Sequence, residues 1–191
     1  MDATILPGLP PYGPTPELFP PGWGHGAHEG TVVCFRANTS PDRIVNFEPG
    51  PGSLTNVFPW IVPDSMLVLS KGAAYLVAGA AGEPILTLAP VVSGVTLLDQ
   101  PRLIIFEEAW TRFLAFLPNG RMWRTRRLSW DGFNDVAISG DTLVGLADDP
   151  TDRSGRPKPF LVDLRTGKSS GGSYTGPDTT DGQLLAPDVA S

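Results

Sequence analysis

The sequence predicts an all-β protein built from antiparallel strands. Glycine and proline supply 22 and 21 of its 191 residues, about double their ordinary share, and both residues disfavour the interior of a helix. Short apolar runs recur between turn residues, which is the pattern of strands. Two of these run-turn-run segments can be interpreted in detail as hairpins, one around Asn119-Gly120 and one around Gly140-Asp141.

The first 30 residues differ from the rest in composition. They contain no Lys or Arg, and prolines stand at positions 7, 10, 11, 14, 16, 20 and 21. Such a segment buries too little apolar surface to offset the entropy lost on ordering, so we expect residues 1–30 to be disordered or extended. Residues 176–191 are polar and are expected to form a flexible tail. The predicted all-β domain therefore covers residues 31–175.

The middle of the chain carries the clearest strand signals. Apolar runs separated by turn residues lie at 66–69, 74–77 and 85–88. Residues 102–117 are ambiguous, because apolar residues also recur there at helical spacing. Several apolar residues fall off the helical stripe and the Asn119-Gly120 turn follows directly. Two strands are therefore favoured over one helix in this stretch.

The two hairpins also predict which residues face each other. An Asn-Gly pair suits the positive φ angles of a two-residue type I′ turn, and such a turn would place Phe116 opposite Trp123. The second turn, which contains Gly-Asp, would place Ile138 opposite Leu143. Each cross-strand pair of this kind stabilises a sheet by about 0.2–1 kcal/mol.

The strand groups recur at about 40 residues, which lies in the range of propeller blades. There is room for about three such units, fewer than the roughly 4–8 blades of a closed propeller. The clearest unit ends in Val-Asp-Leu-Arg-Thr-Gly-Lys at 162–168, and this ending resembles the end of a blade in quinoprotein-like and WD-like β-propellers. The resemblance implies a propeller-blade-like or sandwich arrangement of repeated strand units. In its turn, Asp163 would accept backbone N–H groups and Gly167 would adopt a positive φ.

A second resemblance concerns residues 129–133, Ser-Trp-Asp-Gly-Phe. They are similar to a stretch shared by a group of bacterial proteins, and this similarity implies no activity. Asp131 could be a desolvated acid beside the aromatic rings. Alternatively, Asp131 could cap the backbone donors of a structural turn with Trp130 packed beneath it, and this interpretation is favoured.

Basic and aromatic residues are interleaved just before this stretch. The candidate interaction residues are Arg121, Trp123, Arg124, Arg126, Arg127, Trp130 and Asp131. The pattern is typical of a solvated sheet face, of a protein interface, where Arg and Trp are frequent hot-spot residues, or of a surface that stacks on nucleic acid. The formal charge of −6 makes nucleic acid or another polyanion a poor partner.

Two further groups could hold a metal ion. His25 and His28 are the only histidines and stand in a Gly-rich stretch, and the loop at 148–152 carries three Asp. The rigid helix of a zinc protease and the alternating ligands of a calcium loop are both missing, so solvated loops are favoured. The single cysteine, Cys34, excludes an intramolecular disulfide and a Cys-based zinc site.

The sequence therefore favours a non-catalytic binding module over an enzyme, with no cofactor. The expected partner is another protein or a second copy, bound through exposed strand edges or the Arg/Trp face, because unpaired edges invite strand addition. A small metal-dependent hydrolase using His25 and His28 and a polyanion-binding protein are the alternatives. No apolar run of about 18 residues occurs and no secretory pattern opens the chain, so a soluble cytoplasmic protein without a membrane partner is expected.

Overall fold

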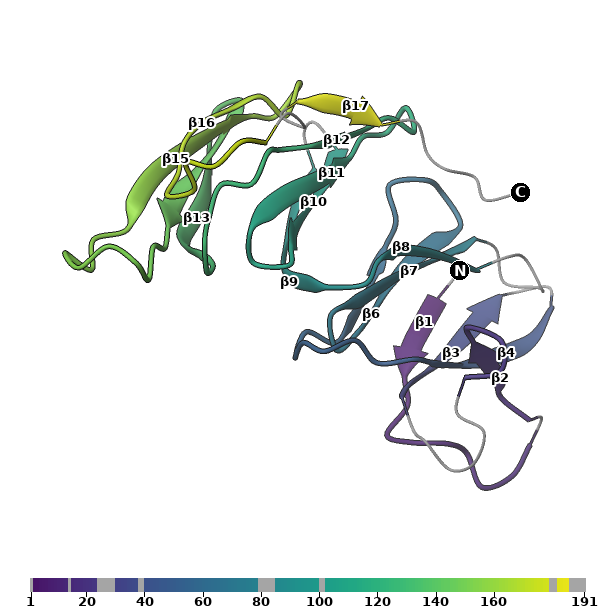
Figure 1. Cartoon of the computed structure of the whole chain (residues 1–191). Coiled ribbons are helices and arrows are strands. Elements are labelled where there is room, and N and C mark those ends of the chain that lie inside the picture. Colours follow the sequence, from purple (N-terminus) through teal and green to yellow (C-terminus); the bar gives the residue numbers. More distant parts are fainter. Residues whose placement is uncertain are drawn as a thin grey trace. The chain divides into compact units, whose positions relative to one another are not determined.

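The computed structural model confirms that the protein is all-β (Figure 1). It describes residues 2–13, 15–23, 30–37, 40–78, 85–99, 102–178 and 182–185. In these ranges the chain forms strands and turns but no helix, and therefore no helix that could cross a membrane. The strands assemble into four sheets with mostly antiparallel pairing. The chain divides into two compact units, unit 1 (Met1–Ser93) and unit 2 (Gly94–Ser191).

Unit 1 contains two four-stranded sheets. Sheet A has the order β1-β3-β4-β2 and consists of β1 (Asp2–Ile5), β2 (Glu17–Phe19), β3 (Thr31–Ala37) and β4 (Ser40–Phe47). Sheet B has the order β5-β6-β7-β8 and consists of β5 (Asn56–Pro59), β6 (Ser65–Ser70), β7 (Ala73–Ala78) and β8 (Ile85–Ala89). Strands β6, β7 and β8 confirm the three apolar runs predicted as strands. The turn between β6 and β7 has positive φ at both Lys71 and Gly72, as a type I′ turn requires.

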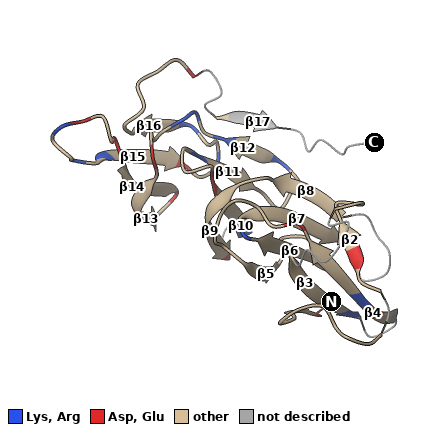
Figure 2. Ribbon diagram, turned by 60° about the horizontal axis from the view of Figure 1, so that its bottom comes forward, with Lys and Arg blue, Asp and Glu red and all other residues tan. Residues whose placement is uncertain are grey.

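Described parts of the N-terminal segment pair with sheet A. Strand β1 runs antiparallel to β3, and β2 runs parallel to β4. The carboxylate of Glu17 on β2 accepts hydrogen bonds from the Arg43 guanidinium on β4, the shortest at 2.7 Å, and Figure 2 shows these charges as red on β2 and blue on β4. The composition of residues 1–30 does not reveal this pairing, because neither strand buries much of its own surface. The predicted division into 1–30, 31–175 and 176–191 stays a prediction.

Sheets A and B share one apolar core. Its buried members are Val33, Phe35, Val45, Phe47, Met66, Val68, Ala73, Tyr75, Val77 and Ile85. The ring centroids of Phe47 and Tyr75 lie 5.2 Å apart, and Phe19 meets Tyr75 edge-on at 5.6 Å. The Tyr75 hydroxyl donates to the carbonyl of Glu48 at 2.9 Å, and burial raises the pKa of Tyr75 to about 12. Aromatic rings from three strands therefore join the two sheets of unit 1.

Unit 2 contains a five-stranded and a four-stranded sheet. Sheet C has the order β17-β12-β11-β10-β9 and consists of β9 (Val92–Asp99), which starts at the end of unit 1, β10 (Arg102–Glu108), β11 (Arg112–Phe116), β12 (Met122–Arg124) and β17 (Gln183–Leu185). Sheet D has the order β13-β14-β15-β16 and consists of β13 (Phe133–Ser139), β14 (Thr142–Ala147), β15 (Lys158–Asp163) and β16 (Ser169–Gly171). Four sheets are present where the sequence suggested about three units, because the N-terminal strands complete sheet A.

The ambiguous stretch 102–117 forms two strands, β10 and β11, and the helical alternative is wrong. The two strands are joined through Ala109 and Trp110, whose φ angles are 49° and 58°. Glycine normally takes such positions, and other residues there store about 1–3 kcal/mol of strain each. The hairpin is thus held by its pairing, and its tip presents an aromatic side chain.

The register predicted for the Asn-Gly hairpin is wrong by one residue. Trp123 pairs with Ala115, and Phe116 pairs with Met122. The cause is a three-residue loop, in which the Leu117 N–H donates to the Arg121 carbonyl at 2.9 Å and only Gly120 has a positive φ. Pro118 stands at the start of this loop and suits the first central position of a type I turn.

The slip of one residue exchanges the faces of the hairpin. Phe113, Ala115 and Trp123 consequently lie together in the core that sheets C and D share. The other fully buried members of this core are Leu103, Ile105, Leu128, Leu143, Ala147, Phe160, Val162 and Leu164. The second predicted hairpin is confirmed, since Ile138 pairs with Leu143.

The turn after β15 is confirmed in the form the sequence predicts. The Oδ1 atom of Asp163 accepts hydrogen bonds from the backbone N–H groups of Arg165 and Thr166, at 3.0 and 2.9 Å, and Gly167 has a φ of 70°. This turn packs on Trp123 of sheet C, whose Nε1–H donates to the Leu164 carbonyl at 2.8 Å. A Cβ at Gly167 would lie only 2.8 Å from the indole ring. A glycine is therefore required both by the turn and by the tryptophan.

Candidate interaction surface

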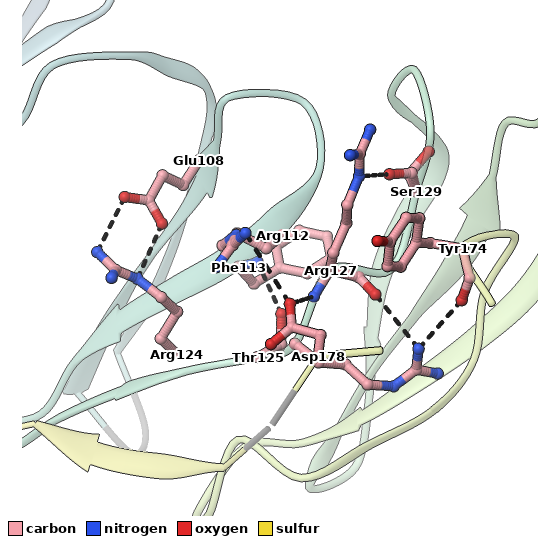
Figure 3. A network of polar contacts seen from close by, with 10 residues as sticks. Glu108, Arg112, Phe113, Arg124, Thr125, Arg127, Ser129, Tyr174 and Asp178 are labelled. Carbon is pink, nitrogen blue, oxygen red and sulfur yellow. Dashed lines mark hydrogen bonds and ion pairs between the residues drawn. The ribbon is translucent and has the colours of Figure 1, made fainter. Parts of the chain in front are cut away.

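The predicted interaction residues do not form one continuous face. Trp123 is fully buried in the core of unit 2 and takes no part in a surface. Arg124, its neighbour on β12, forms an ion pair with Glu108, with Nε and Oε2 at 2.9 Å (Figure 3). Arg121 is exposed in the hairpin loop. Among the predicted interaction residues, only those after β12 are both accessible to solvent and held in place by defined contacts.

Arg127 packs against two aromatic rings that also contact each other. Its guanidinium carbon is 4.8 Å from the centroid of Trp130 and 4.7 Å from that of Tyr174, and the two rings meet each other nearly edge-on at 4.8 Å. The same guanidinium donates to the carbonyls of Ser129 at 2.9 Å and Trp130 at 3.2 Å. Both the planar cation and the rings are thereby fixed, while Trp130 keeps 39% of its surface exposed.

The segment that carries Tyr174 is held beside residues 126–130 by several polar contacts. The N–H groups of Ser173 and Tyr174 donate to the Leu128 carbonyl at 2.8 and 3.2 Å. The Arg126 guanidinium donates to the carbonyls of Tyr174 at 3.2 Å and Gly171 at 2.6 Å. Arg126 thus holds the neighbouring segment in place, because its guanidinium donates to backbone oxygens of that segment.

Asp178 closes the other end of this contact. Its Oδ2 atom accepts the backbone N–H of Arg127 at 2.7 Å and lies 3.9 Å from the guanidinium of Arg112 on β11. Figure 3 shows the three residues converging from separate segments. The carboxylate therefore fixes the backbone at the residue whose side chain packs against the two rings.

The turn at residues 129–132 is present, but its capping residue is not the predicted one. The buried hydroxyl of Ser129 accepts the N–H groups of Asp131 and Gly132 at 3.2 and 3.1 Å and donates to the Gly132 carbonyl at 2.6 Å. Asp131 is exposed, and Trp130 points outward instead of packing beneath the turn. A serine hydroxyl makes these bonds because it both donates and accepts, whereas an ionised carboxylate only accepts.

A second exposed tryptophan, Trp110, stands in a turn that contacts residues 128–129 of unit 2. The Thr111 carbonyl accepts the N–H groups of Leu128 and Ser129 at 2.8 and 3.2 Å. Trp110 directly precedes Thr111 and Trp130 directly follows Ser129, so this contact brings the two tryptophan-bearing turns together. Trp110 is 45% exposed. Together, Trp110, Arg127, Trp130 and Tyr174 define what we term the aromatic–arginine surface.

Sequence reasoning missed two of these four residues. Trp110 is one of several apolar residues at helical spacing within 102–117, and Tyr174 lies far from the others along the chain. For Trp123 a usable signal existed. On β12 it stands between Met122 and Arg124, which are half-buried. Side chains of a strand alternate between the two faces. Because the charged Arg124 favours the solvent face, Trp123 is expected to face the core.

The metal candidates gain no support from the described geometry. His25 and His28 lie outside the described residues. Within the described ranges, no group of three or more His, Cys, Asp or Glu side chains is placed to hold a metal ion. In the acidic loop, Asp149 accepts hydrogen bonds from Thr151. Asp152 pairs with Lys158 at 2.6 Å, and this hydrogen bond lowers the pKa of Asp152 to about 2.

The single cysteine is also an ordinary core residue. Cys34 is buried on β3, and burial, followed by the charge of Asp42, raises the pKa of its thiol. A raised pKa keeps the group as a thiol, which is a poor nucleophile. Cys34 therefore offers no chemistry to the surface.

No protein-family model, no curated protein and no solved structure matches the chain. What the surface can do follows from its side chains. Its four members offer ring faces, one guanidinium, one phenol and one indole N–H on each tryptophan, which bind by stacking, cation–π contact and hydrogen bonding. This arrangement is suited to recognition.

Proposed function

We propose that the protein is a non-catalytic interaction module that binds another protein through the aromatic–arginine surface of unit 2. The observation that carries the proposal is the cluster in which the Arg127 guanidinium packs against both Trp130 and Tyr174 while Trp130 stays exposed. Trp, Tyr and Arg are the residue types that most often carry the binding energy of protein interfaces.

Preorganisation supports this proposal. Immobilising a flexible side chain on binding costs about 0.5–1.5 kcal/mol, and here the cost is already met by hydrogen bonds to the carbonyls of Ser129 and Trp130. Arg126 and Asp178 hold the backbone on both sides of the surface. A partner would meet rings and a cation that need no reordering.

The edge of sheet D at β13 is a weaker choice for binding. The edge strand β13 of sheet D has a bulge between Asn134 and Ala137, and Asp135 within it has a φ of 51°. Bulges of this kind twist an edge away from strand addition. We therefore place partner binding on the side-chain surface.

We also propose that the four sheets are blade-like units of a propeller-related or sandwich architecture. The pairwise sharing of cores, A with B and C with D, supports this. The Asp163–Gly167 turn packed on the tryptophan of the neighbouring sheet supports it as well.

The functional proposal is tested by affinity capture from the protein's native cells, followed by reconstitution. The captured protein is purified and its affinity is measured for the wild type, for Trp130→Ala and for Leu161→Ala. Leu161 is the matched control, because it lies on β15 of the same unit and is 50% exposed. We expect Trp130→Ala to weaken binding about tenfold or more, as for a hot-spot tryptophan, and Leu161→Ala to leave it unchanged.

Two results would overturn the proposal. One is a purified partner that binds wild type and Trp130→Ala with equal affinity. The other is the absence of any partner, including a second copy of the chain, that binds the purified wild type.

A further inference from the structure

Unit 1 displays a proline-rich loop between β1 and β2. Residues 7–16 contain five prolines and no charged side chain, and Tyr12 in this loop is 90% exposed, more than any other large hydrophobic residue in the described part of the chain. Exposing a tyrosine ring this far on a loop without charges gains nothing for the stability of the unit. The loop is therefore an unexplained apolar feature that calls for a ligand role.

The loop is fixed at both of its ends. Before it, the Leu6 N–H donates to the Val32 carbonyl at 2.8 Å. After it, Glu17 pairs with Arg43 and the Phe19 carbonyl accepts the Glu48 N–H at 2.8 Å. Prolines further restrict the φ angles between these anchors. A loop restrained in this way loses little conformational entropy when it binds.

The chemistry of the loop complements the aromatic–arginine surface. Proline-rich segments are recognised by surfaces of exposed Trp and Tyr, on which the proline rings stack, and the aromatic–arginine surface offers the exposed rings of Trp110 and Trp130.

We propose that the loop at residues 7–16 of one copy binds the aromatic–arginine surface of a second copy. This inference rests on the proposed function and names the partner as a proline-rich segment, displayed by the protein itself. The contact joins two different surfaces, so it is heterologous, and repeated contacts extend into a ring or a filament.

Sedimentation velocity of the full-length chain over a concentration series tests the contact. The wild type is expected to self-associate. Tyr12→Ala and Trp130→Ala are each expected to weaken self-association about tenfold or more. Because both side chains are exposed, the circular dichroism spectrum of each variant should match that of the wild type. Leu161→Ala, an exposed leucine outside both surfaces, is expected to associate as the wild type does.

Mixing the two variants gives the decisive measurement. Tyr12→Ala retains an intact surface and Trp130→Ala retains an intact loop, so an equimolar mixture regains one contact and forms a dimer that stops there. A mixture that remains monomeric, or a wild type that is monomeric at all concentrations, overturns the inference. If Trp130→Ala weakens association and Tyr12→Ala does not, the loop is excluded while the proposed function stands.

Discussion

The two units solve the same problem, the joining of two sheets across one apolar core, with different contacts. In unit 1 the rings of Phe19, Phe47 and Tyr75 meet across the core. In unit 2 the indole of Trp123 donates a hydrogen bond to Leu164 and carries the turn at Gly167 on its ring. The first solution depends on strands brought together from distant parts of the sequence. The second also joins residues far apart in the chain, Trp123 and Leu164, but the turn that packs on the indole is a short local motif, and this turn is the part that the sequence predicts.

The largest expected effect on stability is at the contact between Trp123 and the turn at 163–167, which joins the two sheets of unit 2. Trp123→Ala removes a fully buried ring together with its hydrogen bond to the Leu164 carbonyl, and we expect it to lower the free energy of unfolding by about 3–5 kcal/mol. Urea denaturation followed by circular dichroism measures this. Trp130→Ala is the control, because that tryptophan is 39% exposed and lies outside the core of unit 2. Equal losses for the two variants would contradict the core position of Trp123.

A substitution in the aromatic contacts that join the two sheets of unit 1 is expected to lower stability somewhat less. Phe19→Ala removes a partly buried ring that contacts Phe47 and Tyr75, and the expected loss of about 2–3 kcal/mol stays below the value for a fully buried phenylalanine. Leu18→Ala is the matched control, since this neighbour on β2 is exposed. If denaturation shows no difference between the two variants, β2 does not contribute to the core of unit 1.

Gly167→Ala, compared with Gly140→Ala, separates backbone strain in the turn from the contact of the turn with Trp123. The substitution strains a φ of 70° and places a methyl group 2.8 Å from the Trp123 ring, for an expected loss of about 1–3 kcal/mol. Gly140→Ala imposes similar strain at a φ of 59° with nothing within 4 Å. The difference in unfolding free energy between the two variants therefore isolates the contact with tryptophan, and a difference of zero would refute that contact.

The contrast between the units also explains what the sequence predicted. The strands of sheet B, the Ile138–Leu143 pair and the Asp163 turn are set by residues close together in the chain. The predicted register at Trp123 is wrong because it assumes a two-residue Asn-Gly turn, whereas the loop has three residues and begins with Pro118. The pairing of β1 and β2 with sheet A, and the meeting of Trp110 with the segment of Trp130, arise from long-range backbone hydrogen bonds that carry no local pattern.

A smaller effect is expected from the carboxylate in the turn of unit 2. The hydrogen bond from the Thr166 hydroxyl, with the backbone N–H groups of the turn, lowers the pKa of Asp163. A lowered pKa means that its stabilising contribution is complete above the unfolded value of about 3.9 and is lost as the pH falls through the lower folded value. Asp163→Asn keeps an oxygen acceptor but cannot titrate. We expect its urea midpoint to lie below that of wild type at neutral pH and to approach it in acid, and parallel pH profiles would contradict this.

The smallest effect concerns the loop before β15, where Asp152 pairs with Lys158. Because the Lys158 ammonium is the main cause that holds the pKa of Asp152 at about 2, Lys158→Met should raise this pKa toward the ordinary value of about 3.9, with Lys168→Met as the control. Carbon-detected NMR titration of the Asp152 carboxyl measures the shift. Both side chains of the pair are partly exposed to solvent, and ion pairs in such positions contribute little to stability, so the urea midpoint should hardly change. A local charge pair then alters a titration without affecting the core, whereas the Asp163 turn, which packs on Trp123, couples its titration to the stability of unit 2. A clear change in the urea midpoint for Lys158→Met would remove this distinction.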